Sequence, residues 1–240
     1  MLEMSRYIDL DMYHEVERSH PYYTDMVEKI LACIEKYHQK QSRPLNILEL
    51  GAGTGLFTED LIKKKYLNVD ALEIDSNSIP ILEKHVLRQA HCIQGDATIY
   101  CREGFYDLVC STFAHDHIHF NLAETFVQNI RRNLKKGGLY LMGGEILPYF
   151  ETEEQRCQAL HAYHGFIIEK ANREGHFALA QIEISALRSG IEMVGDFKRH
   201  ELMFEQEMLK ADFTQKVKIK MGPRHKPEVG GVFVYIYEAT

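Results

Sequence analysis

The sequence of 240 residues lacks any apolar run of about 18 residues, the length that a membrane-spanning helix needs. Its first residues also lack the basic stretch and apolar run that begin a secretory signal peptide. The five cysteines are odd in number, widely scattered and never arranged as Cys-x-x-Cys, which is typical of reduced thiols. We therefore expect a cytoplasmic protein with no membrane association.

Positive charge is also scarce. Lys and Arg total 28 against 35 Asp and Glu, which gives a net charge of -7. A protein that binds a phosphate backbone usually carries the opposite sign, so we expect no nucleic-acid partner. Hydrophobic residues make up 45% of the chain and charged residues 26%, a composition typical of a globular domain.

Short apolar segments alternate with amphipathic helical patterns across residues 44–148. The strands are expected at 45–50, 69–74, 90–94, 106–112 and 139–146, and the helices at 54–65, 77–88 and 122–134. Such an alternation predicts a parallel sheet with helices on both faces. We expect the glycine pair Gly137-Gly138 to end the last of these helices, because glycine is the usual residue after a helix C-terminus.

The regions on either side of 44–148 do not show this alternation of strands and helices. Residues 1–43 predict an N-terminal helical cap, a helix from Tyr7 to Gln39 broken at His20-Pro21, and residues 149–195 predict a lid of two consecutive helices, 151–172 and 176–187. Residues 196–240 predict a helix at 200–210 and two edge strands, 213–221 and 232–238. The whole is expected to be one domain of the α/β class. The five strands of its cofactor-binding core, 44–148, and the two edge strands would together form a Rossmann-like doubly wound sheet of seven strands, mostly parallel with an antiparallel last strand.

A glycine-rich turn follows the first expected strand, in Glu49-Leu50-Gly51-Ala52-Gly53-Thr54-Gly55. Glycine allows a positive φ and the close approach of a ligand to the main chain. A dinucleotide-binding loop would read Gly-x-Gly-x-x-Gly/Ala. The sixth position is Leu56 counted from Gly51 and Thr58 counted from Gly53, so neither register fits.

The spacing of Gly51, Gly53 and Gly55, with Glu49 two residues earlier, resembles the first motif of class I S-adenosylmethionine-dependent methyltransferases of the small-molecule type. The resemblance implies S-adenosyl-L-methionine as cofactor. It also implies that Glu49 lies near the ammonium of the methionine portion and that the glycines form the floor of the site.

The same resemblance assigns residues at the ends of later strands. Glu73, 18 residues after Gly55, would accept hydrogen bonds from the ribose hydroxyls, and Asp96 would accept one from the adenine amino group. We also expect Ala97 and Ser111 at the cofactor. A glycine-rich turn or a single acidic residue is common by chance. Here, however, each acidic residue stands at the end of an expected strand, and the ends of parallel strands meet at one edge of the sheet.

The segment from Phe105 to Ile118 resembles the fourth motif of the family and contains His115-Asp116-His117. Three interpretations remain open. His117 or His115 acts as a general base, because the pKa of histidine lies near neutrality. Alternatively the histidines and Asp116, with His119 and with His161 or His164, hold a metal, or they are only polar packing. We predict the base and expect no metal.

Small-molecule members of the family often close N-terminal helices and an insertion after the fifth strand over the substrate. This resemblance makes Asp116, Tyr13, Tyr22, His161 and His164 the candidate substrate contacts. His161 and His164 are three residues apart on an expected helix and would share a face. An ordinary amphipathic helix packed on the sheet explains the same pattern.

The predicted activity is the transfer of a methyl group to an oxygen or nitrogen atom of a small-molecule metabolite. One alternative is a protein of this fold with non-methylating chemistry, a cyclase or a histidine-metal enzyme. Another is a non-catalytic cofactor-binding partner of a second enzyme. The sequence leaves the oligomeric state open between a monomer and a homodimer.

Overall fold

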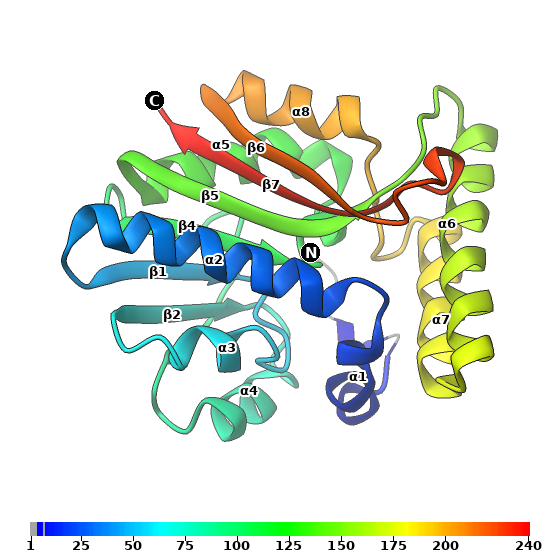
Figure 1. Ribbon diagram of the computed structural model, residues 1–240, viewed down its shortest axis with the longest axis horizontal. Coiled ribbons are helices and arrows are strands. Elements are labelled where there is room, and N and C mark those ends of the chain that lie inside the picture. Colours follow the sequence, from blue (N-terminus) through cyan, green and yellow to red (C-terminus); the bar gives the residue numbers. More distant parts are fainter. Residues whose placement is uncertain (1–3, 7) are drawn as a thin grey trace.

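The computed structural model describes residues 4–6 and 8–240, and one sheet of seven strands runs through it (Figure 1). The strand order is β3-β2-β1-β4-β5-β7-β6. The strands are β1 (Leu45–Leu50), β2 (Leu67–Glu73), β3 (His91–Gln94), β4 (Tyr106–Thr112), β5 (Leu134–Ile146), β6 (Phe213–Gly222) and β7 (Gly231–Ala239).

Strands β1 to β5 pair in parallel, and β7 lies antiparallel between β5 and β6. The predicted α/β class, with a mostly parallel seven-stranded sheet, is confirmed. The chain order along the sheet reverses between β1 and β4, so the loops after these strands diverge to opposite faces. In doubly wound sheets the crevice at such a point, beyond the carboxyl ends of the strands, is where ligands bind.

Helices cover both faces of the sheet (Figure 1). One face carries α2 (Tyr23–Gln41), α3 (Thr58–Ile62) and α4 (Ile79–Val86), and the other carries α5 (Ala123–Asn133) and α8 (Glu201–Lys210). Adjacent residues of the central strands pack into different hydrophobic cores. Ile47 belongs to the core on the α2 side and Leu48 to the core on the α5 side. This burial on both faces explains why the strands are continuously apolar.

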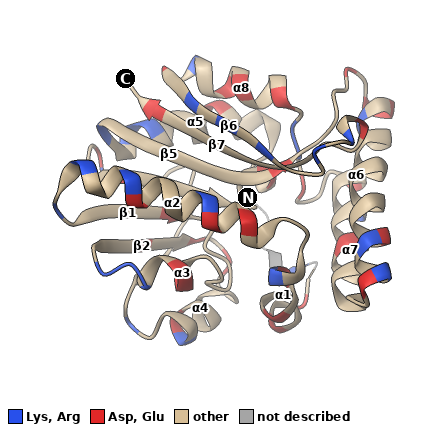
Figure 2. Cartoon of the chain, viewed as in Figure 1, with Lys and Arg blue, Asp and Glu red and all other residues tan. Residues whose placement is uncertain are grey.

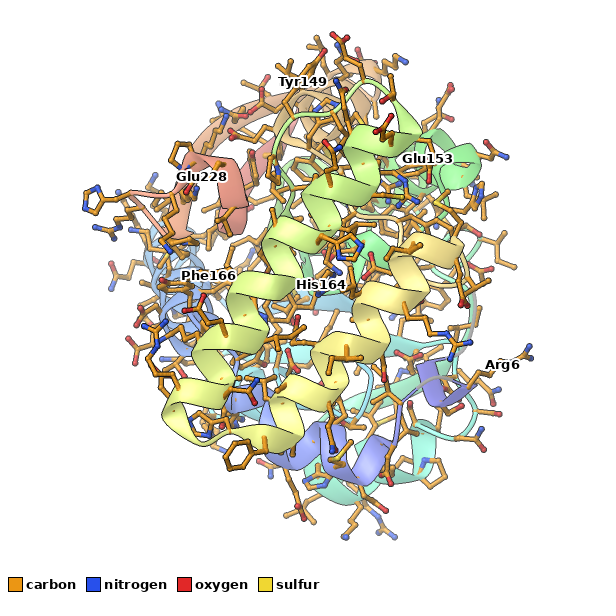
Figure 3. All side chains as sticks on the ribbon, turned by 90° about the vertical axis from the view of Figure 1, so that its right-hand side faces the viewer. Arg6, Tyr149, Glu153, His164, Phe166 and Glu228 are labelled. Carbon is orange, nitrogen blue, oxygen red and sulfur yellow. The ribbon has the colours of Figure 1, made fainter. Side chains whose placement is uncertain are left out.

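The remaining helices lie beyond the carboxyl edge of the sheet. They are α1 (Leu10–Val16), followed by the short 3-10 helix η2 (Glu17–Ser19), and the long pair α6 (Glu153–Glu174) and α7 (Phe177–Glu192). Figure 3 shows α6 and α7 side by side in front of this edge, and α1 contacts α7. Cap and lid therefore meet where a ligand of the sheet would bind.

Several boundaries differ from the sequence prediction. The N-terminal helical region does break at His20-Pro21, although Tyr7, where it was expected to start, lies outside the described residues. Helix α3 is shorter than the helix predicted at 54–65, because residues 54–57 form turns that belong to the glycine loop. The glycine pair does not end α5; the helix ends at Asn133, and β5 starts at once and runs through Gly137, where φ is +73°.

Basic and acidic side chains are interspersed over the visible face, and they alternate along α2 (Figure 2). Within residues 4–6 and 8–240, no helix combines the length and the apolar character that crossing a bilayer requires.

Candidate active site

A narrow, partly enclosed hollow lies at the carboxyl ends of β1, β2 and β4. The residues that line it are Tyr13, Tyr23, Glu49, Gly51, Ala52, Gly53, Thr54, Leu56, Phe57, Glu73, Ile74, Thr112, Phe113, Ala114 and His117. Its cavity volume is about 60 Å³, well below the roughly 300–1,000 Å³ of an open small-molecule site. A ligand therefore enters only when the cap or these walls move outward.

The glycine loop brings the main chain to the floor of this hollow. The Gly51 amide donates to the Leu72 carbonyl across 2.9 Å, which anchors the turn to β2. Gly51 has a φ of +68°, and a Cβ there would lie 2.6 Å from the Cβ of Ala114. Both the backbone conformation and the close approach of the loop after β4 thus require glycine.

Two buried carboxylates flank the loop. Glu73, at the end of β2, accepts from the Gly53 amide at 2.7 Å and from the Asp75 amide at 2.8 Å, and burial raises its pKa. Glu49, at the end of β1, is 1% exposed and accepts from the Thr58 hydroxyl at 2.6 Å. Burial raises the pKa of Glu49 to about 8, despite the lowering effect of the Thr58 hydroxyl.

The other predicted cofactor residues lie outside the lining of the hollow. Asp96 follows β3, and its Oδ1 accepts from both the amide and the hydroxyl of Thr98 at 2.8 Å. Ala97 is buried in the core on the α5 side. The Ser111 hydroxyl points to that side too, since it bonds to the Tyr140 hydroxyl at 2.7 Å.

His117 borders the hollow and is half-buried. Its Nδ1 lies 2.6 Å from the Gly195 carbonyl oxygen. Because a carbonyl only accepts, this contact places the hydrogen on Nδ1 and leaves Nε2 as the atom that can take up a proton. The arrangement suits a general base.

The structure does not bring His115 to the same hollow. Its ring is buried against Phe126 and Phe204, with Nδ1 3.1 Å from the Tyr140 hydroxyl and Nε2 3.0 Å from Glu207. Burial lowers the pKa of His115. This histidine, in the short 3-10 helix after β4, links β5 to α8 on the opposite side of the sheet.

Aromatic side chains of the cap and of the loop after β4 form the remaining walls. Tyr13 of α1 lines the hollow as predicted for a substrate contact, but Tyr22 packs against Gly222 of β6. Tyr23 lines the hollow instead, and its ring lies 5.7 Å from that of Phe113. Sequence reasoning missed Phe113, although its position directly after β4 is the signal that could have found it.

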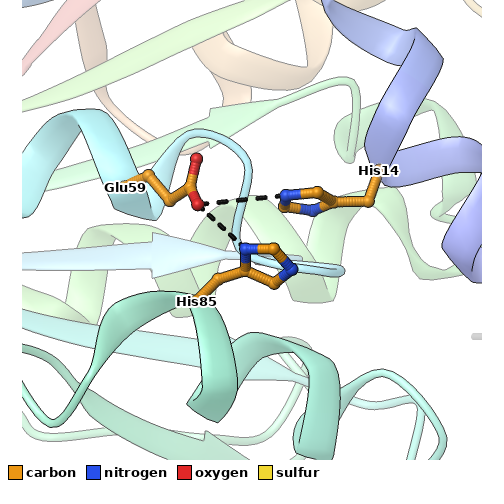
Figure 4. Close-up of side chains that lie close together, drawn as sticks. All are labelled: His14, Glu59 and His85. Carbon is orange, nitrogen blue, oxygen red and sulfur yellow. Dashed lines mark hydrogen bonds and ion pairs between the residues drawn. The ribbon is translucent and has the colours of Figure 1, made fainter.

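A polar cluster holds α1 against the glycine-loop side of the core (Figure 4). The ring of His14 stacks on that of His85 at 3.7 Å, and Glu59 lies 3.0 Å from His85 Nδ1 and 3.9 Å from His14 Nε2. His14 Nδ1 also bonds to the Thr54 hydroxyl at 2.9 Å. Thr54 lines the hollow, so these contacts fasten the cap over it.

The remaining predicted substrate contacts are spread apart. His161 is exposed on α6, whereas His164, three residues later, is fully buried and lies between α6 and α7 (Figure 3). The two do not share an environment. Asp116 is 3% exposed and does not line the hollow, and burial raises its pKa to about 6.

A second polar group is buried between cap, core and lid, and of its members only His164 was predicted from the sequence as a site residue. His20, Glu145, Glu183, Lys198 and His164 make its contacts. Glu145 ends β5 as Glu73 ends β2, so the strand-end argument used for Glu73 could have found it. No comparable signal marks His20 or Glu183, because only the tertiary structure brings them together.

Comparisons with known proteins agree with this geometry. Residues 48–142 match the family described as methyltransferase domain. No curated protein matches the chain. Among solved structures, a TehB-like SAM-dependent methyltransferase of Corynebacterium glutamicum is similar at 15% identity, with a TM-score of 0.52 over 81% of this chain and 80% of that one.

Two further structures have the same fold. The PH0226 protein of Pyrococcus horikoshii is 17% identical, with a TM-score of 0.59 over 94% of this chain and 99% of that one. A geranyl diphosphate C-methyltransferase of Streptomyces coelicolor is 8% identical, with a TM-score of 0.58 over 82% of this chain and 70% of that one. At such identities the likeness concerns the fold alone.

The residues of the hollow fit S-adenosylmethionine. The glycine turn brings main chain to the wall of the hollow, and Glu49 and Glu73 are buried carboxylates that could accept from an ammonium and from hydroxyl groups. The glycine loop does not have the Gly-x-Gly-x-x-Gly/Ala pattern of a dinucleotide-binding loop. Residues 48–142 thus match a methyltransferase domain, and the sheet of the whole chain has the fold of the S-adenosylmethionine-dependent methyltransferases among these solved structures.

Proposed function

We propose that the protein transfers the methyl group of S-adenosylmethionine to an oxygen or nitrogen atom of a small-molecule metabolite. The observation that carries this proposal is the position of His117. It borders the same hollow as Gly51 and Glu73, and its Nδ1 is engaged by the Gly195 carbonyl, which leaves Nε2 free. A base and the cofactor floor thus share one enclosed space.

The walls of the hollow favour a small acceptor. Tyr13, Tyr23 and Phe113 surround the space beside His117, and α1 covers it. An acceptor must fit within these walls once the cap has opened and closed. A duplex or a folded protein would need an open groove there, and the closed cap argues against both.

The chemistry divides between cofactor and protein. The cofactor supplies a methyl group on a positively charged sulfur, which is already an activated leaving group. Glu49 would hold its ammonium and Glu73 its ribose hydroxyls, while Tyr23 and Phe113 keep water out of the hollow. His117 Nε2 takes the proton of the attacking hydroxyl or amine, a contribution of roughly 10²–10⁴-fold.

The test is a screen with methyl-labelled S-adenosylmethionine against fractionated metabolite extracts. We expect label in a small product with the wild-type protein and none with Glu73→Ala, and mass spectrometry then assigns the methylated atom. A product that forms without incorporation of label would overturn methyl transfer in favour of another reaction. Label found only on carbon would overturn the oxygen or nitrogen assignment.

A further inference from the structure

Three side chains from three parts of the chain converge in the protein interior. They are His20, between η2 and α2; Glu145, at the end of β5; and Glu183, on lid helix α7. His20 Nε2 lies 3.2 Å from Glu145 Oε1 and 3.6 Å from Glu183 Oε1. The exposed fractions of the three side chains are 1%, 10% and 5%.

Each of these side chains is oriented by a partner on its other polar atom. His20 Nδ1 lies 3.0 Å from the carbonyl oxygen of Pro21, Glu183 Oε2 lies 2.8 Å from His164 Nδ1, and Glu145 Oε2 lies 2.9 Å from Lys198 Nζ. Glu145 Oε1 also accepts from the Tyr163 hydroxyl at 2.5 Å and keeps a second lone pair, whereas His20 Nε2 and Glu183 Oε1, the atoms that face it, make no further polar contact within the described residues. Metal-binding histidines and carboxylates are held by outer partners in this way.

With a neutral imidazole, His20 Nε2 and the carboxylate oxygens of Glu145 and Glu183 are all hydrogen-bond acceptors, so they repel one another. The Pro21 carbonyl can only accept, so the hydrogen of a neutral His20 is on Nδ1 and the Nε2 lone pair faces two carboxylates. His20 Nε2 is buried and makes no well-directed hydrogen bond. A buried lone pair between two carboxylates is repulsive, so a cation is required among them.

The charge around this space favours a divalent ion over a single proton. Asp116, Glu145, Glu183 and Asp196 are all more than nine-tenths buried here, and the ammonium that pairs with Glu145 and Asp196 is that of Lys198. One proton on His20 would leave two of these four negative charges unbalanced. A doubly charged ion would leave only one negative charge unbalanced. This matters because an unpaired charge in the protein interior is destabilising.

The distances also suit a metal. Ligands about 2.1 Å from an ion in tetrahedral geometry lie roughly 3.4 Å apart. The two nitrogen–oxygen separations of 3.2 and 3.6 Å bracket that value. Imidazole and carboxylate together are ligands of zinc, manganese and iron ions, whereas magnesium and calcium take oxygen ligands.

We propose that His20, Glu145 and Glu183 form a binding site for one divalent transition-metal ion. The ion fastens the N-terminal cap and the α6–α7 lid to the end of β5. The site is separate from the proposed methyl transfer, since none of its three residues lines the cofactor hollow. The ring of Phe113, whose centroid is 4.9 Å from that of the His20 ring, contacts His20 and also lines the hollow.

One other group of the described residues could be considered for a metal, namely His14, Glu59 and His85 (Figure 4). Its two rings are stacked at 3.7 Å with an angle of 28° between their planes. Their in-plane lone pairs cannot converge on one ion in that arrangement. The group is also only partly buried, so it serves as the internal control.

The experiment uses the full chain, stripped with a chelator and without added cofactor. Co²⁺ is titrated while visible absorption is recorded, and Zn²⁺ retained after gel filtration is measured by elemental analysis. We expect one equivalent of either ion, bound at least about 100-fold more weakly by Glu183→Gln, with unchanged binding by His85→Asn. Zn²⁺ should also raise the thermal unfolding temperature of the wild type but not of Glu183→Gln.

Three results would overturn the proposal. The first is the absence of any bound Co²⁺ or Zn²⁺ in the wild type, which needs no variant and so holds even if Glu183→Gln fails to fold. The second is binding that Glu183→Gln keeps and His85→Asn loses. The third is a thiolate charge-transfer band of Co²⁺, because the described part of the site has no cysteine. Calorimetry with S-adenosylmethionine on the stripped protein tests the proposed function independently.

Discussion

The carboxylate of Glu73 accepts a hydrogen bond of 2.7 Å from the amide of Gly53, which joins the end of β2 to the glycine loop. Its second oxygen accepts from the amide of Asp75 at 2.8 Å. One side chain therefore orders both turns that border the cofactor hollow. The loop is held in shape by the residue that also offers the remaining lone pairs to a ligand.

We expect Glu73→Gln to weaken the binding of S-adenosylmethionine at least about tenfold. A glutamine offers one acceptor oxygen, so its amide group would face a backbone donor and leave a buried polar group unsatisfied. Calorimetry measures the dissociation constant. Glu83→Gln, on the exposed surface of α4, is the matched control, and equal affinity of the two variants would contradict the assignment.

Gly51→Ala should destabilise the protein more than Gly104→Ala. Both glycines have a positive φ, +68° and +60°, so both variants carry the backbone cost of roughly 1–2 kcal/mol. Only at Gly51 would the new Cβ also meet another atom, the Cβ of Ala114 at 2.6 Å. Urea unfolding without cofactor measures the difference. Equal losses would show that the loop can shift away from Ala114.

Cofactor binding should release a proton at neutral pH. The pKa of Glu49 is about 8 in the free protein because the group is buried, so the carboxyl is mostly protonated at pH 7. An ammonium partner requires the ionised form, hence affinity should rise as the pH increases to about 8 and then level off. Calorimetry in two buffers of different ionisation enthalpy counts the proton. Release that persists in Glu49→Gln would refute this source.

The ion pairs of Asp107 should make the free energy of unfolding depend on pH in the acidic range. Burial alone would raise its pKa, but Arg43, Lys135 and the Asn46 amide lower it to about 2. The unfolded value is near 3.9, so this stabilisation is complete above about pH 4 and is lost as the pH falls toward 2. Because Arg43 is half-exposed, we expect only about 1–2 kcal/mol.

Urea unfolding of the wild type and Asp107→Asn between pH 6 and pH 2.5 provides the measurement. The stability advantage of the wild type should shrink as the pH falls. Two parallel curves would mean that Asp107 is not the titrating group.

His117→Ala should lower turnover by about 10²–10⁴-fold and leave the affinity for S-adenosylmethionine within a factor of two. His161→Ala is the control, because His161 is exposed on α6 away from the hollow, and it should keep full activity. A loss of cofactor affinity in His117→Ala would instead make this residue a binding contact.

Local sequence patterns were sufficient for much of the fold. The apolar strands, the break at His20-Pro21 and the glycine loop all follow from periodicity and turn chemistry. The helix ends within one residue of the expected position, but the glycine pair expected to stop it lies inside β5, which starts at Leu134 and not at residue 139 because it pairs with β4 from there.

The sequence by itself determined the class of sheet and the carboxylates at two of its strand ends, Glu49 and Glu73. Both follow from short-range order, since a strand that runs into a glycine turn must end at the sheet edge. Only the tertiary structure decided which aromatic and histidine side chains meet there. Tyr23 replaces Tyr22 in the hollow, and His20 reaches Glu145 and Glu183, because these contacts depend on how cap and lid pack, and packing joins residues with no periodic relation in the chain.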